Sequence, residues 1–302
     1  MSSFLQTRTG VAVGLAVLST LTLSGCGDST ATENLPRKNF ARWSSALDEF
    51  VPRKEEAASY ASLLLDAACM RDAGYSSWAP PWRETNPDPG PGWNPVGIRL
   101  FSLDLATAYG YRIPPAVRSD TNPEWLAFVQ SKNGALKAGE QKAFTACADA
   151  DRAKHRMVNL DGGTLNLAMG YMSLASEKAR ASETTKAAEK RWRTCMAPQG
   201  VTDLPQTPED MPSHSLAEEF GIGQNLEGPA SAGEIEVAIA DARCRQSSGY
   251  SRTFYDIRWD ESVRLLNENR DRLERARELI NAHDKAAQEV INAHAPSRPD
   301  GS

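Results

Sequence analysis

The amino-acid sequence predicts a mainly α, helix-rich extracytoplasmic domain built from two related halves, stapled by two disulfides and ending in a long C-terminal helix. Apolar residues recur at helical spacing along most of the chain, and no run of alternating β-branched residues indicates a strand. Four cysteines occupy positions that repeat between the halves. A secretion-type N-terminus precedes them, which indicates an oxidising compartment.

The first 25 residues carry the pattern of a secretory signal peptide. Arg8 is the only charged side chain before Val11–Leu23, which is thirteen residues long and has no charge. A basic start followed by an apolar core of about 7–15 residues is typical of such signals. A transmembrane helix needs about 20 apolar residues, so the run is short for a membrane anchor. We expect residues 1–25 to be removed, which leaves 277 of the 302 residues.

The segment Leu23–Cys26, LSGC, resembles the lipobox of bacterial lipoproteins. The resemblance implies that cleavage leaves Cys26 as the first residue and that a diacylglycerol is joined to its sulfur. Two acyl chains are needed for stable anchoring, and a diacylglycerol supplies them. The alternatives are an ordinary cleaved signal with a chance cysteine and an uncleaved membrane anchor. The expected location is the extracytoplasmic face of the cell membrane, on a lipid anchor.

Residues 26–41 form the predicted lipidated, flexible tether. The segment is small, polar and weakly apolar, so it should stay unfolded. About 15 residues of flexible chain span roughly 20 Å, enough to lift a folded body clear of the headgroups. The body then divides into a first helical half with a Pro/Trp-rich loop, residues 42–160, and a second helical half with the long C-terminal helix, residues 161–302.

The cysteines other than Cys26 number four: Cys69, Cys147, Cys195 and Cys244. An even number in an oxidising compartment favours two disulfides over free buried thiols. No two of them lie within four residues of each other, as a zinc site would normally require, so we expect no metal. Each half has a helix that ends in C-M-x-x-x-G and a later helix with one cysteine. This pattern favours Cys69–Cys147 and Cys195–Cys244 over the two other connectivities.

A wider resemblance rests on RWRTCMAPQG, EIEVAIADARCRQSSGY and the charged helix that follows them. These segments are similar to an uncharacterised family of actinobacterial secreted lipoproteins. Residues 99–115, RLFSLDLATAYGYRIPP, resemble the piece that those proteins carry between their first two cysteines. The similarity spans most of residues 55–292. It implies the location and the helical fold, and it implies no activity.

The periodicity predicts seven helical stretches, at residues 42–50, 55–73, 123–132, 138–157, 164–197, 233–248 and 258–292. Ser231 and Glu234 have the spacing of a capping box at the start of the sixth.

The last stretch carries an apolar residue every seven positions: Leu266, Leu273, Ile280 and Ala287. Thirty-five residues would make a rod of about 52 Å. A helix laid along the domain is the favoured interpretation, and a coiled coil with a partner is the alternative. The coiled coil is weaker because the second apolar position of each heptad holds Asn269, Ala276 or His283.

Residues 78–95, WAPPWRETNPDPGPGWNP, contain six prolines that fix an extended path. Trp78, Trp82 and Trp93 are the candidate binding residues, because tryptophans on a stiff loop can stack on sugar rings or grip a partner. The structural alternative is that they pin the loop to the helices.

Composition and motifs exclude several classes of function. After removal of the signal, 33 basic residues face 39 acidic ones, which argues against nucleic acid as a partner. None of the four histidines has a partner at metal-ligand spacing, and no H-E-x-x-H or G-x-S-x-G is present. We therefore expect no catalytic residues and no cofactor.

The function expected from these observations is a non-catalytic binding or scaffolding role at the cell envelope. The partners are the membrane, through the N-terminal lipid, and an envelope protein or peptidoglycan. One alternative is a cell-wall glycan binder that uses the Trp/Pro loop. The other is an envelope hydrolase with an unrecognised site, because the absence of known motifs does not exclude a new one.

Overall fold

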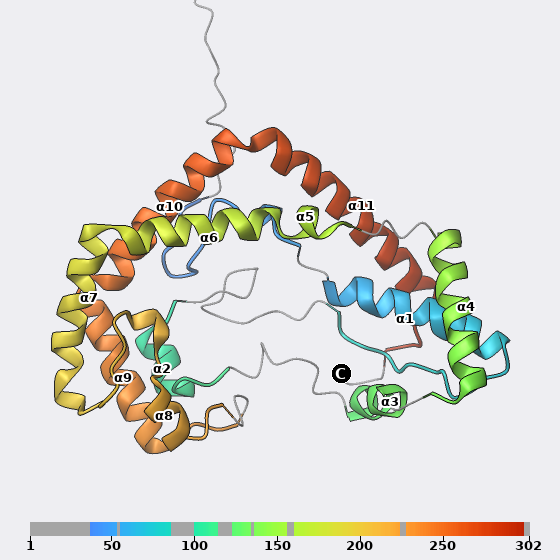
Figure 1. Cartoon of the computed structure of the whole chain (residues 1–302), viewed down its shortest axis with the longest axis horizontal. Coiled ribbons are helices and arrows are strands. Elements are labelled where there is room, and N and C mark those ends of the chain that lie inside the picture. The colour runs from blue at the N-terminus through green and yellow to red at the C-terminus, as the bar shows by residue number, and fades with distance from the viewer. Residues whose placement is uncertain are drawn as a thin grey trace, which may run out of the picture. The chain divides into compact units, whose positions relative to one another are not determined.

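The computed structural model describes residues 37–52, 55–85, 100–113, 123–133, 136–155, 160–223 and 228–298, all within one compact unit, Pro36–Ser302. Over these ranges the chain is rich in helix and contains no strand, as Figure 1 shows, which confirms the mainly α fold. The predicted signal peptide, Cys26 and Trp93 lie outside the described residues. None of the helices in these ranges combines the length and apolar character that crossing a bilayer takes.

The α-helices in chain order are α1 (Glu55–Asp72), α2 (Leu103–Tyr109), α3 (Pro123–Asn133), α4 (Ala138–His155), α5 (Gly162–Leu165), α6 (Leu167–Ala181), α7 (Glu183–Met196), α8 (His214–Glu219), α9 (Ala232–Ser247), α10 (Tyr250–Glu268) and α11 (Arg270–His294). Short 3₁₀ helices are η1 (Asp48–Phe50), η3 (Ala197–Gln199) and η4 (Pro208–Asp210).

One set of core contacts gathers on α1, which packs against both α11 and α4. The Tyr60 ring of α1 meets the Trp125 ring of α3 edge-on, with 5.7 Å between the ring centroids. The buried residues of this set are Tyr60, Ala61, Leu64, Leu65, Trp125, Ala287 and Val290 on one side of α1, and Ala67, Met70, Trp78 and Cys147 on the other. Helix α1 therefore buries two faces, which removes apolar surface from water on both sides.

A second set of core contacts gathers on α9, which packs against α2, α7 and α10. Its buried residues are Ala106, Tyr111, Ile222, Ala238 and Ala242 in one cluster, and Trp192, Met196 and Cys244 in another. Helix α6 runs beside α10 (Figure 1). Since α1 packs on α11 and α2 on α9, contacts run across the predicted division at residue 160.

Both disulfides join neighbouring helices. Cys69 of α1 bonds to Cys147 of α4 with an Sγ–Sγ distance of 2.02 Å, and Cys195 of α7 bonds to Cys244 of α9 at 1.98 Å. The structure thus confirms the two disulfides and the connectivity that the repeated cysteine pattern favoured.

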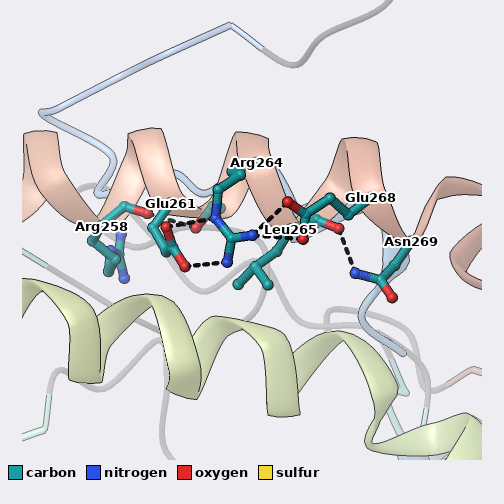
Figure 2. Close-up of polar contacts among 7 residues, drawn as sticks. Arg258, Glu261, Arg264, Leu265, Glu268 and Asn269 are labelled. Carbon is teal, nitrogen blue, oxygen red and sulfur yellow. Dashed lines mark hydrogen bonds and ion pairs between the residues drawn. The ribbon is translucent and has the colours of Figure 1, made fainter.

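The predicted single rod at 258–292 is wrong in one respect, because two helices, α10 and α11, meet at Asn269. The Asn269 side-chain amide donates to the Leu265 carbonyl at 2.9 Å, and its Oδ1 accepts from the Tyr171 hydroxyl of α6 at 2.7 Å. Asparagine competes for backbone groups in this way, which explains why the helix ends there. Figure 2 shows Asn269 at the end of α10, one turn beyond Arg264, whose guanidinium lies between Glu261 and Glu268.

The seven-residue apolar repeat of the C-terminal region faces the protein itself. Leu266, Leu273, Ile280 and Ala287 are all buried within this chain. Burial against the chain's own helices agrees with a helix laid along the domain.

The predicted helix at 164–197 is likewise interrupted, so that α6 ends at Ala181 and α7 begins at Glu183. Ser182 between them has an extended backbone, with ψ 135°. Its carbonyl accepts from the Lys186 amide at 3.0 Å, which makes Ser182 the N-cap of α7.

Candidate functional site

A pocket of about 530 Å³ lies between the start of α2, the end of α9 and the start of α10. Its walls carry aromatic and aliphatic side chains together with two arginines. The lining residues are Phe40, Leu100, Phe101, Ser102, Leu103, Asp104, Ala242, Arg245, Gln246, Ser251 and Arg252. The combination of apolar walls and a few charged groups is typical of small-molecule sites.

A tight turn brings the two arginines to one pocket. Gly249 links α9 to α10 with φ +74°, in the left-handed region that glycine adopts without strain. Its amide donates to the Gln246 carbonyl at 3.1 Å. The turn places Arg245, near the end of α9, and Arg252, in the first turn of α10, on the same wall.

The opposite wall comes from α2, whose first turn is fixed by a side-chain cap. Ser102 precedes α2, and its Oγ accepts from the Leu105 amide at 3.3 Å. A serine at the N-cap satisfies one of the amides that lack a partner at the helix start. The cap sets the direction of α2, so that Leu103 and Asp104 reach the pocket.

Arg245 is held by a carboxylate one helical turn earlier. Its Nε donates to Asp241 Oδ1 at 2.8 Å and its Nη2 to Asp241 Oδ2 at 2.7 Å, while Nη2 also reaches the Pro208 carbonyl. Burial by itself lowers the pKa of Arg245, but the Asp241 carboxylate outweighs that effect and holds the pKa above its ordinary value. The face of the guanidinium lies 4.6 Å from the centre of the Phe101 ring.

Asp241 also accepts from two buried aromatic donors. The Trp192 indole Nε1 donates to Oδ1 at 2.8 Å, and the Tyr111 hydroxyl lies 3.3 Å from Oδ2. Burial raises the pKa of Tyr111, and the negative charge of Asp241 raises it further, so the phenol stays protonated. The carboxylate of Asp241 is therefore fully occupied by donors from α7, α9 and the end of α2.

A second buried ion pair stands beside the first. Glu234 has no exposed surface, and its Oε2 accepts from Arg112 Nε at 2.9 Å. Glu234 Oε1 accepts from the Tyr111 amide at 3.1 Å. The predicted capping box is confirmed in one half: Ser231 Oγ accepts from the Glu234 amide at 3.2 Å. The Glu234 carboxylate, in contrast, turns to Arg112.

Arg252 is arranged differently from Arg245. It is exposed, and its guanidinium lies 4.1 Å from the centre of the Phe40 ring. Within the ranges that the structure describes, no acidic side chain forms an ion pair with it. A guanidinium stacked on a ring keeps its N–H donors in the plane, where they can bind an anion.

This arrangement is suited to binding. Asp241 and Glu234 are buried and held in ion pairs, so neither is free to act as a general base. Asp104 is the carboxylate on the pocket wall itself, and it is exposed. Across the described ranges, no three or more His, Cys, Asp or Glu side chains come together as a metal site.

A second pocket of about 530 Å³ lies between η1 and α11, and its charged lining residues balance, Arg277 and Lys285 against Glu49 and Asp284. Arg277 pairs with Glu49 at 3.0 Å and also with Glu274. The pocket of Arg252 is the stronger candidate because its walls carry more aromatic and aliphatic side chains.

The three tryptophans of the Pro/Trp-rich loop, which the sequence offered as candidate binding residues, differ in their surroundings. Trp78 is buried: its ring stacks on Phe144 with 5.1 Å between centroids, and its Nε1 donates to Glu140 at 2.7 Å. Trp82 is half-buried, with the Arg298 guanidinium 5.0 Å from its ring. Trp93 lies outside the described residues. The structure thus places Trp78 in the core.

Sequence reasoning did not identify the pocket residues. One signal was present: Glu234, Asp241 and Arg245 occupy the buried side of α9 together with Ala238 and Ala242. Charged residues in register with small apolar ones on a helix indicate buried ion pairs. Nothing in the sequence indicated that Phe40 would meet Arg252.

Comparison with known proteins adds no relative. No family model matches this chain, and neither the curated proteins nor the solved structures yield a match.

Proposed function

We propose that this chain is a lipid-anchored protein on the extracytoplasmic face of the cell membrane, whose helical body binds a ligand without catalysing a reaction. The observation that carries the binding role is the pocket between α2, α9 and α10. It combines aromatic walls with a stacked arginine, and its second arginine, Arg245, is held by the Asp241 carboxylate.

The proposed location has separate support from the sequence. An uncharged run of thirteen residues ends at the LSGC motif, and Cys26 is the cysteine that would carry the lipid. The four other cysteines all form disulfides, which persist in oxidising compartments outside the cytoplasm. Two acyl chains on Cys26 suffice for stable membrane attachment.

Intact-mass analysis of protein extracted from bacterial membranes tests the anchor. We expect loss of residues 1–25 and a diacylglycerol-sized addition on Cys26. Alkylation before reduction should label none of the other four cysteines. A Cys26→Ser variant is the matched control, and it should partition into the aqueous phase of a detergent extraction. An unlipidated Cys26 or four reactive thiols would overturn the location.

Crosslinking at the pocket tests the binding role. A photo-crosslinking residue replaces Ser251, which lines the pocket beside Arg252, and intact cells are irradiated before mass spectrometry. The same residue at Arg243, which is exposed on α9 and does not line the pocket, is the control. We expect a reproducible adduct at position 251 that is absent at 243. No adduct at 251, or the same adduct at both positions, would contradict the proposal.

A further inference from the structure

We propose that the pocket binds a small organic anion with an apolar body, such as an aromatic or long-chain acid. Arg252 binds the anionic group, and the phenylalanine and leucine walls hold the body. This inference deepens the proposed binding function and rests on it.

Arg252 is held in position by an aromatic ring. Its guanidinium is positioned on Phe40 at 4.1 Å from the ring centre, and Phe40 is in turn packed edge-on against Tyr255 at 5.3 Å. The ring occupies one face of the guanidinium and leaves the in-plane donors open. A planar fork of donors matches a carboxylate, sulfonate or phosphate group, which accepts two parallel hydrogen bonds.

Arg245 contributes a further hydrogen-bond donor to the same pocket. The hydrogen bonds of this residue use Nε and Nη2, and in the part of the chain that the structure describes its Nη1 has no acceptor. Arg245 lines the same pocket as Arg252 and is about nine-tenths buried. Because the Asp241 carboxylate compensates the positive charge of Arg245, Arg245 contributes a fixed hydrogen-bond donor to the pocket and not a second free cation.

The other charges on the pocket wall limit the charge of the ligand. Asp104 also lines the pocket and sits in the first turn of α2. With Arg245 compensated by Asp241, the remaining lining charges are Arg252 and Asp104, which oppose each other. A single negative charge placed at Arg252 is therefore favoured, whereas a polyanion would meet the Asp104 carboxylate.

Apolar side chains also line the pocket. Leu100, Phe101 and Leu103 line the pocket together with the arginines, and Leu103 keeps 37% of its surface exposed. An apolar ligand body would cover that surface and remove it from water, which favours binding. The Phe101 ring is fixed because it stacks on Tyr111 with 5.3 Å between centroids.

Two fluorescent probes that differ only in charge test this proposal. 8-Anilinonaphthalene-1-sulfonate is an anion with an aromatic body, and N-phenyl-1-naphthylamine is the same body without the sulfonate. Fluorescence titration of the full chain gives both dissociation constants. We expect the anionic probe to bind roughly tenfold more tightly, because its sulfonate accepts charge-assisted hydrogen bonds from Arg252 that the neutral probe cannot accept.

Four variants locate the binding. Arg252→Gln should weaken the sulfonate probe roughly tenfold and leave the neutral probe unchanged, and Arg243→Gln, on the exposed side of α9, should change neither. Leu103→Gln should weaken both probes. Asp104→Asn should strengthen the sulfonate probe alone, since it removes the opposing charge.

The outcomes separate the two proposals. If neither probe binds the wild-type protein, the binding role proposed for the pocket fails. If both probes bind, Leu103→Gln weakens both and Arg252→Gln changes neither, the pocket binds but the anion specificity is wrong. If Leu103→Gln weakens neither, the probes sit elsewhere and the pocket assignment is overturned. Leu103 and Arg252 are exposed, so we expect all four variants to keep the thermal midpoint of the wild type. Equal midpoints show that the changes in probe affinity report binding and not unfolding.

Discussion

The guanidinium of Arg245 forms a two-point ion pair with the carboxylate of Asp241, four residues earlier on the same helix, through contacts of 2.8 and 2.7 Å. Both side chains are buried, and Asp241 has no exposed surface. A buried pair of this kind contributes little net stability, but loss of one partner leaves the other charge buried without compensation. The pair therefore makes α9 sensitive to single substitutions beside the pocket.

Asp241→Ala should lower the free energy of unfolding by about 3–5 kcal/mol, because it leaves Arg245 unpaired and also removes the acceptor of the Trp192 indole. Urea denaturation measures the change. The double variant Asp241→Leu, Arg245→Met should recover only the part of the loss that the unpaired Arg245 causes, because the Trp192 indole and the Tyr111 hydroxyl still lack their acceptor. Arg243→Ala on the exposed side of the same helix should stay within about 0.5 kcal/mol of wild type. A loss for Asp241→Ala as small as that of Arg243→Ala would refute the buried-pair argument.

Gly110→Ala should also destabilise the protein. Gly110 ends α2 with φ +58°, and a Cβ there would lie 2.8 Å from Glu234 Oε1, which is paired with Arg112. Backbone strain and overpacking together predict a loss of about 2–4 kcal/mol. Gly170→Ala in α6 is the matched control, since nothing lies within 4 Å of its added Cβ. It should raise stability by about 0.4–1 kcal/mol. Equal thermal midpoints for the two variants would contradict the close packing at Gly110.

Stability should fall at alkaline pH partly through Tyr60. Burial raises the pKa of Tyr60 to about 12, although Arg83 acts in the opposite direction. The folded state therefore binds more protons than the unfolded state between pH 10 and 12. The stabilisation is complete below about pH 10 and is lost as the pH rises to about 12, by about 2–3 kcal/mol.

Urea denaturation at several pH values checks the Tyr60 contribution. Tyr60→Phe loses the hydrogen bond to the Pro81 carbonyl, so it should be less stable at pH 7 by about 1 kcal/mol. Its stability should then decline less steeply than that of wild type between pH 10 and 12. Parallel declines for the two proteins would show that Tyr60 titrates normally.

Trp78→Ala should act on stability rather than on glycan binding. The substitution removes the stacking on Phe144 and leaves Glu140 without its indole donor, which predicts a loss of about 3–5 kcal/mol. At a temperature where the variant is folded, sedimentation with purified peptidoglycan should equal that of wild type. Loss of sedimentation with an unchanged thermal midpoint would instead show that Trp78 contacts a ligand.

Several elements of the fold follow from local sequence patterns. Apolar spacing predicted α1, α3, α4 and α9 within a few residues of their observed bounds. The repeated C-M-x-x-x-G pattern predicted the pairing of Cys69 with Cys147 and of Cys195 with Cys244. Such patterns work because the periodicity of a helix fixes which residues share a face.

Other elements could not be predicted because their cause lies elsewhere in the chain. The break at Asn269 depends on Tyr171, which donates to the Asn269 side chain from α6. The short helices α2 and α8 carry few periodic residues of their own, and α2 is stabilised by packing on α9. Trp78, which the sequence offered as a binding residue, is buried because Phe144 and Glu140 come to meet it.

By itself, the sequence determined the helical class, the disulfide pairing and the apolar stripe of the C-terminal helices, because periodicity and cysteine spacing are properties of neighbouring residues. Only the tertiary structure brought the residues of the candidate pocket together. Phe40 and Arg252 are far apart in the chain, yet the arginine lies on the ring. Contacts of this kind arise when helices pack, and no local pattern encodes them. The tertiary structure also compensated Arg245 with Asp241 and left Arg252 as the stacked cation of the pocket.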